Sequence, residues 1–259
     1  MDARFEEGRT ASSEALALAL ATAPPPYLEG ALANPAIHPH HLLLALRNPR
    51  IAGALILRIS QNRAWLKEYD LKAGIVLHPK TPRAVAMNLV SFLWWRDLAR
   101  VVDRAVLAPP LRRTAERILS LRLQELALGE KITLARVASR GVINALRQER
   151  EPMVIRALLQ NPRLVEEDAL AIASSRRTPP AVLQALAGDA RWSPRPTLQK
   201  AIAKHPETPA RIALHILHGL STKDLRELAQ AARVPGLVKV AAQRLLESRR
   251  RPKRESSNG

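Results

Sequence analysis

The 259-residue chain contains no cysteine and few aromatic residues, and each scarcity excludes a class of protein. Without cysteine there is no disulfide framework, no thiolate-bound metal or iron–sulfur cluster, and no cysteine nucleophile. Aromatic residues make up 3% of the chain, and 10 glycines stand against 20 prolines, while hydrophobic residues reach 47%. A hydrophobic share made mostly of alanine and leucine predicts helices separated by prolines, with little material for strands.

Long apolar runs are also missing. No segment supplies the roughly 20 consecutive apolar residues of a membrane-spanning helix, so no membrane span is predicted. Residues 15–23 resemble the apolar core of a signal peptide, but acidic residues precede them where a signal peptide is basic. We therefore expect a cytoplasmic protein.

Basic residues outnumber acidic residues, with 41 lysines and arginines against 23 aspartates and glutamates. The formal charge is +18, divided as −3 over residues 1–30, +8 over 31–130, +9 over 131–248 and +4 over 249–259. A field of this sign attracts polyanions such as nucleic acid or an acidic protein. Arginine supplies 32 of the 41 basic residues, so the arginine-rich composition of a GC-rich genome is the alternative origin of the charge.

The chain repeats itself at an offset of 127 residues. Without gaps, residues 4–119 share 25 identities in 116 pairs with residues 131–246, where the composition would give roughly eleven by chance. The matches include rare residues: Asn34-Pro35 with Asn161-Pro162, Trp65 with Trp192, and His-Pro-Lys-Thr-Pro at 78–82 with His-Pro-Glu-Thr-Pro at 205–209. This pattern predicts a tandem duplication.

Between these proline-marked turns the apolar residues recur at helical spacing, and proline at a first helical position marks helix starts. In the second half the pattern predicts helices near 152–160, 165–174, 179–187, 195–204, 209–218, 223–232 and 236–248. Each is too short to persist alone and must bury one face against its neighbours. The sequence therefore predicts a stack of short helices.

Residues 185–209 run from Ala-Leu-Ala-Gly-Asp through Trp192 to Lys-His-Pro-Glu-Thr-Pro. This stretch resembles the leucine-rich repeat variant motif of the HEAT-like α-solenoids, clearly over 155–218 and more weakly over 28–92. The resemblance implies an all-α, right-handed superhelical α-solenoid of short helices. The founding member of that family carries a cysteine-bound iron–sulfur cluster, which a chain without cysteine cannot hold, so we expect no cofactor.

The duplication suggests four parts: an N-terminal segment, partly helical or flexible, at 1–24, a first solenoid half at 25–127, a second at 128–248, and a disordered basic tail at 249–259. We expect a monomer.

Histidines are the only candidate metal ligands in groups. His38, His40 and His41 form one tract and two more histidines, at 215 and 218, share a helix face, but neither group has a supporting carboxylate. We therefore expect no metal site. His78 and His205 occupy the asparagine position of the turn motif, which suggests a role in the turn.

No phosphate loop, nucleophile elbow or metalloprotease motif is present, but basic residues gather at the expected turns. A helix start offers unpaired N–H groups, and a cation beside it is suited to a phosphate. We predict a non-catalytic protein that binds the backbone of DNA or RNA. The candidate residues are Arg50, Lys80, Arg83, Arg176, Arg177, Arg191, Arg195, Lys200 and Lys204, with Arg249, Arg250 and Arg251 in the tail.

Two alternatives stay open. A repeat protein can be a scaffold for an acidic protein partner, because stacked repeats offer extended surfaces. HEAT-like alkylpurine DNA glycosylases are also basic helical solenoids that use tryptophan and aspartate, and here Trp94 and Asp97 share a helical face with Trp192 as a second wall. That enzymatic hypothesis rests on fold analogy.

Overall fold

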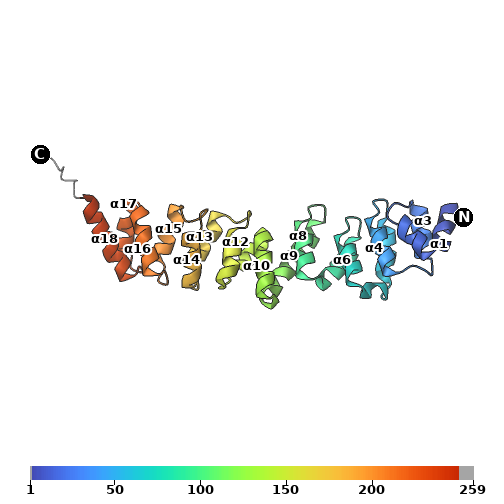
Figure 1. The fold of residues 1–259 in the computed structure, drawn as a ribbon, viewed down its shortest axis with the longest axis horizontal. Coiled ribbons are helices and arrows are strands. Elements are labelled where there is room, and N and C mark those ends of the chain that lie inside the picture. The colour runs from blue at the N-terminus through green and yellow to red at the C-terminus, as the bar shows by residue number, and fades with distance from the viewer. Residues whose placement is uncertain (1, 251–259) are drawn as a thin grey trace. The chain divides into compact units, whose positions relative to one another are not determined.

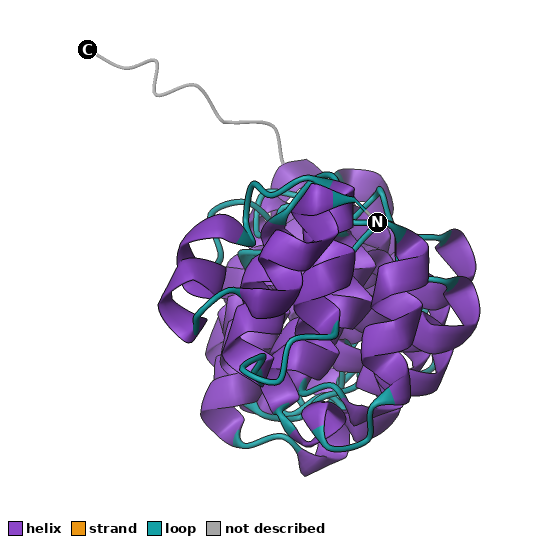
Figure 2. Ribbon diagram, turned by 90° about the vertical axis from the view of Figure 1, so that its right-hand side faces the viewer, coloured by secondary structure: helices purple, strands orange, loops and turns teal. Residues whose placement is uncertain are grey.

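In a computed structural model, residues 2–250 are described, and they form eighteen α-helices and three short 3-10 helices with no strand (Figures 1 and 2). The chain divides into two compact units, one ending at Arg122 and the other beginning at Leu123. The all-α prediction is confirmed. Within residues 2–250, no helix combines the length and apolar character needed to cross a bilayer.

The first unit holds nine α-helices that follow one another in chain order. They are α1 (Ala3–Thr10), α2 (Ser13–Ala19), α3 (Pro25–Leu32), α4 (Pro39–Arg47), α5 (Gly53–Gln61), α6 (Tyr69–Leu77), α7 (Arg83–Leu89), α8 (Trp95–Asp103) and α9 (Pro109–Leu121). The 3-10 helices η1 (Trp65–Lys67) and η2 (Val90–Phe92) lie between them. The N-terminal segment 1–24, expected to be partly helical or flexible, forms α1 and α2.

The second unit opens with the 3-10 helix η3 (Arg122–Glu125), which starts on the last residue of the first unit. Its α-helices are α10 (Leu128–Val137), α11 (Arg140–Leu146), α12 (Pro152–Leu159), α13 (Glu166–Ser174), α14 (Pro180–Gly188), α15 (Pro196–Lys204), α16 (Ala210–Gly219), α17 (Thr222–Gln230) and α18 (Gly236–Arg250). The seven helices expected here are confirmed, with bounds within two residues of those predicted. Because α18 runs to Arg250, Arg249 and Arg250 belong to a helix rather than to the expected tail, whose other residues lie outside the described part.

Helices alternate between two layers in each unit, because a helix packs against the helix after next as well as against its neighbour. In one layer of the first unit, α1 packs against α3 and α7 packs against α9. In the same layer of the second unit, α12 packs against both α10 and α14, and α16 packs against α18. We call this layer A. In layer B, each of α2, α4, α6 and α8 packs against the next of these four helices, and α13 packs against α15. By their place in the chain order, α11 and α17 also belong to layer B. This arrangement is compatible with an α-solenoid.

Burial of one face explains why such short helices form. In α12, for example, Val154, Ile155 and Leu158 are fully buried, while Met153 and Arg156 are exposed. Burial of each large aliphatic side chain stabilises the fold by about 1.5–3 kcal/mol relative to exposure. Proline at the first helical position, as at Pro152, supplies the starting φ without losing a hydrogen bond.

Side chains in several turns bond backbone carbonyls that lie 23–33 residues earlier. The buried Asn161 amide donates to the carbonyl oxygens of Ala135 and Ala138, at 2.8 and 3.1 Å. The equivalent bonds in the first unit run from Asn34 to the carbonyls at positions 8 and 11, at 2.9 and 2.8 Å. These bonds satisfy backbone acceptors that helix ends leave unpaired.

Many features recur at the 127-residue offset. The bounds of α3, α4, α5, α6 and α8 coincide with those of α12, α13, α14, α15 and α17 when 127 is added. His78 Nδ1 accepts the backbone N–H of residue 80 at 3.1 Å, and His205 Nδ1 accepts that of residue 207, also at 3.1 Å. The turn role expected for these histidines is confirmed.

Candidate nucleic-acid interface

Several of the basic residues proposed to contact phosphates instead bind the protein's own backbone. The Lys80 ammonium donates to the carbonyl of Pro49 at 2.7 Å. The Arg191 guanidinium donates to the carbonyls of Asn161 and Leu164, at 3.1 and 2.9 Å, and lies 4.3 Å from the centroid of the neighbouring tryptophan ring. These cations therefore hold one turn against the turn of the preceding repeat.

Arg249 has the same kind of role at the end of the second unit. Its guanidinium donates to the carbonyls of His218 and Leu220, each at 2.8 Å, where α16 ends. Arg122, 127 residues earlier, makes the matching pair of bonds at the end of η2, at 2.6 and 2.9 Å. Since the last carbonyls of a helix have no partner within the helix, arginine satisfies them in both units.

Three further candidates are engaged by carboxylates. Lys200 bonds Asp224 at 3.1 Å and Glu227 at 2.9 Å, and Lys204 bonds Glu227 at 2.5 Å. The hydrogen bonds from Lys204 and Lys200 lower the pKa of the Glu227 carboxyl to about 2. Arg195 lies 3.6 Å from the carboxylate of a glutamate at the start of α13. A phosphate would have to compete with these acids.

The remaining candidates are exposed. Within residues 2–250 no hydrogen bond or ion pair engages the side chains of Arg50, Arg83, Arg176, Arg177 or Arg250. Arg251 lies outside the described residues. The expected set thus falls into three groups: cations that bond backbone carbonyls, cations paired with carboxylates, and cations with no such partner among residues 2–250.

One groove in layer B of the second unit brings three of the candidates together. Arg176, Lys200 and Lys204, with Arg233, line a groove of about 1070 Å³ whose remaining walls are largely apolar side chains of α13 and α15 and of the turn after α17. Two of these four cations are the lysines paired with acids. The groove is therefore an apolar channel with a cationic rim. We call it the layer B groove.

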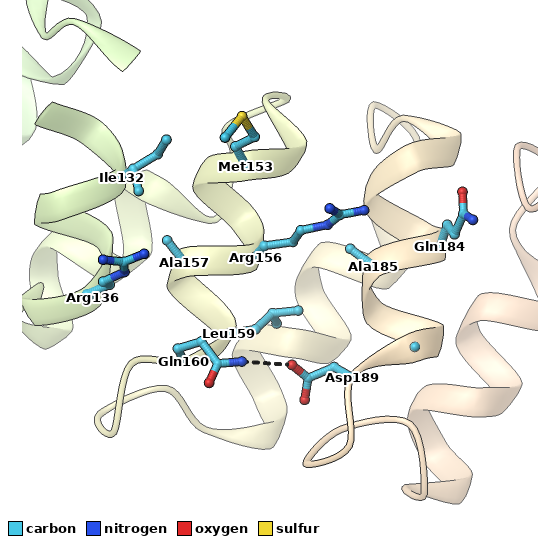
Figure 3. A pocket seen from close by; sticks show the side chains of 11 residues that line it. Ile132, Arg136, Met153, Arg156, Ala157, Leu159, Gln160, Gln184, Ala185 and Asp189 are labelled. Carbon is cyan, nitrogen blue, oxygen red and sulfur yellow. Dashed lines mark hydrogen bonds between the residues drawn. The ribbon is translucent and has the colours of Figure 1, made fainter. Parts of the chain in front are cut away.

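A second groove, in layer A of the second unit, holds cations that are not among the candidates predicted from the sequence. Arg136 of α10 and Arg156 of α12 line a groove of about 670 Å³ between α10, α12 and α14. Figure 3 shows the Arg136 side chain extending toward Ala157, and the Arg156 side chain toward α14. At one end of the groove the Gln160 amide donates to Asp189 at 3.3 Å. We call it the layer A groove.

The two layers of the second unit differ in their acids. In layer A, α12, α14 and α16 contain no acidic residue and α10 and α18 hold one each. In layer B, α13 holds three and α17 two, while α11 and α15 hold none. Arg136, Arg156 and the exposed Arg211 of α16 thus lie on a layer with few carboxylates, and none of them has an ion pair among residues 2–250. These arginines stand on helix faces rather than in turns. The sequence carries no local signal that separates them from other arginines on exposed helix faces.

The tryptophans fall into different environments. Trp192 is 2% exposed and its indole N–H donates to the carbonyl of Leu159 at 3.2 Å, so it fills the space between helices. Trp94 is 65% exposed. The carboxylate of Asp97 accepts a hydrogen bond from the Tyr69 hydroxyl at 2.6 Å and pairs with an arginine at 2.9 Å. Asp97 therefore has partners on both oxygens, and Trp192 presents no open ring face.

The histidine tract of α4 is partly buried. His40 and His41 lie with their Nε2 atoms 3.0 Å apart, and the Ser13 hydroxyl lies 3.2 Å from His41. Burial, with the neighbouring His40, lowers the pKa of His41. Among residues 2–250, no group of three or more histidine, aspartate or glutamate side chains is arranged to hold a metal ion.

No protein-family model, no curated protein and no solved structure matches the chain.

Proposed function

We propose that the protein is an α-solenoid, built from a tandem duplication, that binds the phosphate backbone of a nucleic acid without catalysing a reaction. The recurrence of helix bounds and turn hydrogen bonds at the 127-residue offset supports the duplication. The alternating packing of short helices supports a solenoid.

The observation that carries the binding proposal is the set of unpaired arginines on layer A of the second unit. Arg136, Arg156 and Arg211 come from three helices of one layer; α12 and α16 carry no acid, and the Glu130 carboxylate of α10 accepts the backbone N–H of Ala127 at the start of its own helix. Arginine contacts phosphates with its planar fork of donors. Adjacent packed helices lie about 8–10 Å apart, so Arg136 and Arg156, on the packed helices α10 and α12, offer successive contacts along a backbone and little readout of sequence.

Salt dependence tests the proposal directly. If about six phosphates are neutralised, affinity for a labelled oligonucleotide falls roughly a thousandfold between 50 and 200 mM salt. In the double variant Arg136→Gln, Arg156→Gln we expect weaker binding and a salt slope smaller by about 2. The matched control Lys223→Gln, Arg226→Gln removes the same charge from α17 in layer B and should leave the slope near the wild-type value. An affinity that barely responds to salt would contradict the proposal.

The layer B groove favours a second candidate function, a scaffold for an acidic protein. An apolar floor with Arg176 and Arg233 at its rim suits an amphipathic peptide that carries acids beside leucines. This function predicts a defined partner in a pull-down that survives nuclease treatment and is lost in the variant Arg176→Glu, Arg233→Glu. Retention of the partner by that variant would remove this candidate.

A further inference from the structure

An aromatic cluster is exposed on the first unit, at the turn between η2 and α8. Trp94 is 65% exposed and Phe92 is 61% exposed. Large apolar side chains that gather on a surface mark a place of interaction more often than scattered ones do. The cluster belongs to the first unit, whereas the residues that line both grooves described above belong to the second.

Trp94 is held in place from one side. The ring of Tyr69, the first residue of α6, stacks on it with centroids 3.9 Å apart and planes 14° from parallel. The Tyr69 hydroxyl donates to Asp97 at 2.6 Å and accepts the backbone N–H of Trp94 at 2.9 Å. Burial and the bond to Asp97 raise the pKa of Tyr69 to about 12, so the phenol keeps its proton and its bond at neutral pH.

Two cations lie beside aromatic rings of this turn. The Lys72 ammonium lies 5.8 Å from the centroid of the Phe92 ring. Arg96, in the first turn of α8, is exposed and lies 5.3 Å from the ring of the buried Trp95. The Arg122 guanidinium fixes the backbone of the same turn through two carbonyls. Rigid aromatic rings beside cations are the elements of a surface that stacks unpaired bases and holds their phosphates.

The second unit shows that the fold does not require this cluster. The positions that match Tyr69, Phe92 and Trp94 at the 127-residue offset are Pro196, Gly219 and Ser221. Ser221 is the N-cap of α17, and its hydroxyl accepts the N–H of residue 224 at 3.1 Å.

Trp94 is the N-cap of α8 and makes no such side-chain bond. Tryptophan at this position therefore forgoes a stabilising cap and exposes an apolar ring, although serine builds the same turn in the second unit. A binding role accounts for both losses.

We infer that Trp94, backed by Tyr69, is a stacking platform for an unpaired nucleobase, and that the nucleic acid bound by this protein is single-stranded. The inference rests on the proposed nucleic-acid function and names the class of its ligand. The ring face that Tyr69 leaves uncovered receives the base, and Lys72 and Arg96 contact the adjoining phosphates. A paired base is stacked inside its duplex and cannot reach this face.

The test compares two probes on the full-length protein: a labelled 12-nucleotide single strand and a 12-base-pair duplex, each measured by fluorescence anisotropy at fixed salt. Trp94→Ser introduces the residue found at the matching position of the second unit, and a serine hydroxyl can cap the start of α8. We expect it to weaken single-strand binding between about five- and a hundredfold, the range of one base–aromatic stack, and to change duplex binding less than twofold. Trp94→Phe should restore most of the loss.

The control Leu18→Ser removes an apolar side chain of the same unit that is 80% exposed and has no aromatic ring, and it should leave both affinities unchanged. If the wild type binds both probes and Trp94→Ser loses nothing, the platform is overturned while the proposed function stands. If the wild type binds neither probe at 50 mM salt, the proposed function fails and the platform with it. A loss of self-association in Trp94→Ser, with unchanged single-strand affinity, would identify the cluster as a contact between copies and also overturn the inference.

Discussion

The two units use the same succession of helices but complete it with different side chains. In the first unit the turn before α8 carries exposed Phe92 and Trp94, whereas the matching turn before α17 has glycine and serine. In the second unit Glu227 joins Lys200 and Lys204, where the matching positions of the first unit hold Arg100, alanine and leucine. What the units share is the turn scaffold, and the residues that differ at the turns before α8 and α17 are exposed. Surface differences of this kind are where distinct functions are expected.

The units also differ in how closely their first and third helices approach. Gly8 of α1 and Gly30 of α3 face each other's backbone, and a Cβ on Gly30 would lie 2.0 Å from the carbonyl oxygen of Phe5. The matching residues of the second unit are Ala135 and Ala157. The pair α10 and α12 therefore accommodates two methyl groups that α1 and α3 exclude.

The largest expected effect on stability comes from exchanging glycine and alanine at these matching positions. Gly30→Ala should destabilise the first unit by about 3 kcal/mol, because a backbone contact at this distance can be relieved only by moving α1. The reverse change in the second unit, Ala157→Gly, should cost about 1 kcal/mol from the lower helix propensity of glycine. Urea unfolding of both variants, with limited proteolysis to detect release of α1, checks the prediction. Equal losses at the two positions would show that the helix pairs are spaced alike.

A smaller effect separates structural from functional arginines. Arg249→Ala and Arg122→Ala each remove two bonds to helix-end carbonyls, so each should cost about 1 kcal/mol of stability. If closing α16 is the main role of Arg249, Arg249→Ala lowers the urea midpoint and speeds amide exchange at the end of α16, with little change in nucleic-acid affinity. A variant of unchanged stability and weakened binding would restore Arg249 to the set of phosphate contacts.

The helices could be predicted from the sequence because their signals are local. Proline at the first position of α12, α14 and α15, and the apolar stripe after it, lie within one helix, so their bounds follow from neighbouring residues. The partners of the turn cations could not be predicted in this way. The acceptors of Arg191 are carbonyls 27 and 30 residues earlier, and they come within reach only when one repeat stacks on the next.

The residues of the candidate site also divide into those with a local sequence signal and those whose surroundings depend on distant residues. Arg176 and Lys204 are candidates because they stand beside proline-marked turns, and Lys200 because it lies one helical turn before Lys204; the fold places all three on one groove. Arg136 and Arg156 were missed because a single arginine on a helix face reads as ordinary solvated surface until the layers are known. The environment of Trp94 could not be predicted from neighbouring residues, because the ring that stacks on it belongs to Tyr69, 25 residues earlier in the chain.

The smallest effect concerns the charge cluster that only the second unit contains. Because Lys204 and Lys200 hold the pKa of Glu227 down to about 2, below the ordinary value of about 4.3, the folded state favours the carboxylate. The resulting stability is fully present above about pH 4.5 and is lost as the pH falls toward 2. Glu227→Gln should therefore have a lower Tm than the wild type at pH 7, by no more than a few degrees since these side chains are partly exposed. The difference should shrink below pH 4.5, vanish near pH 2, and be reduced at neutral pH by 1 M salt. A difference in Tm that is the same at pH 7 and pH 2 would mean that Glu227 acts through packing and not through its charge.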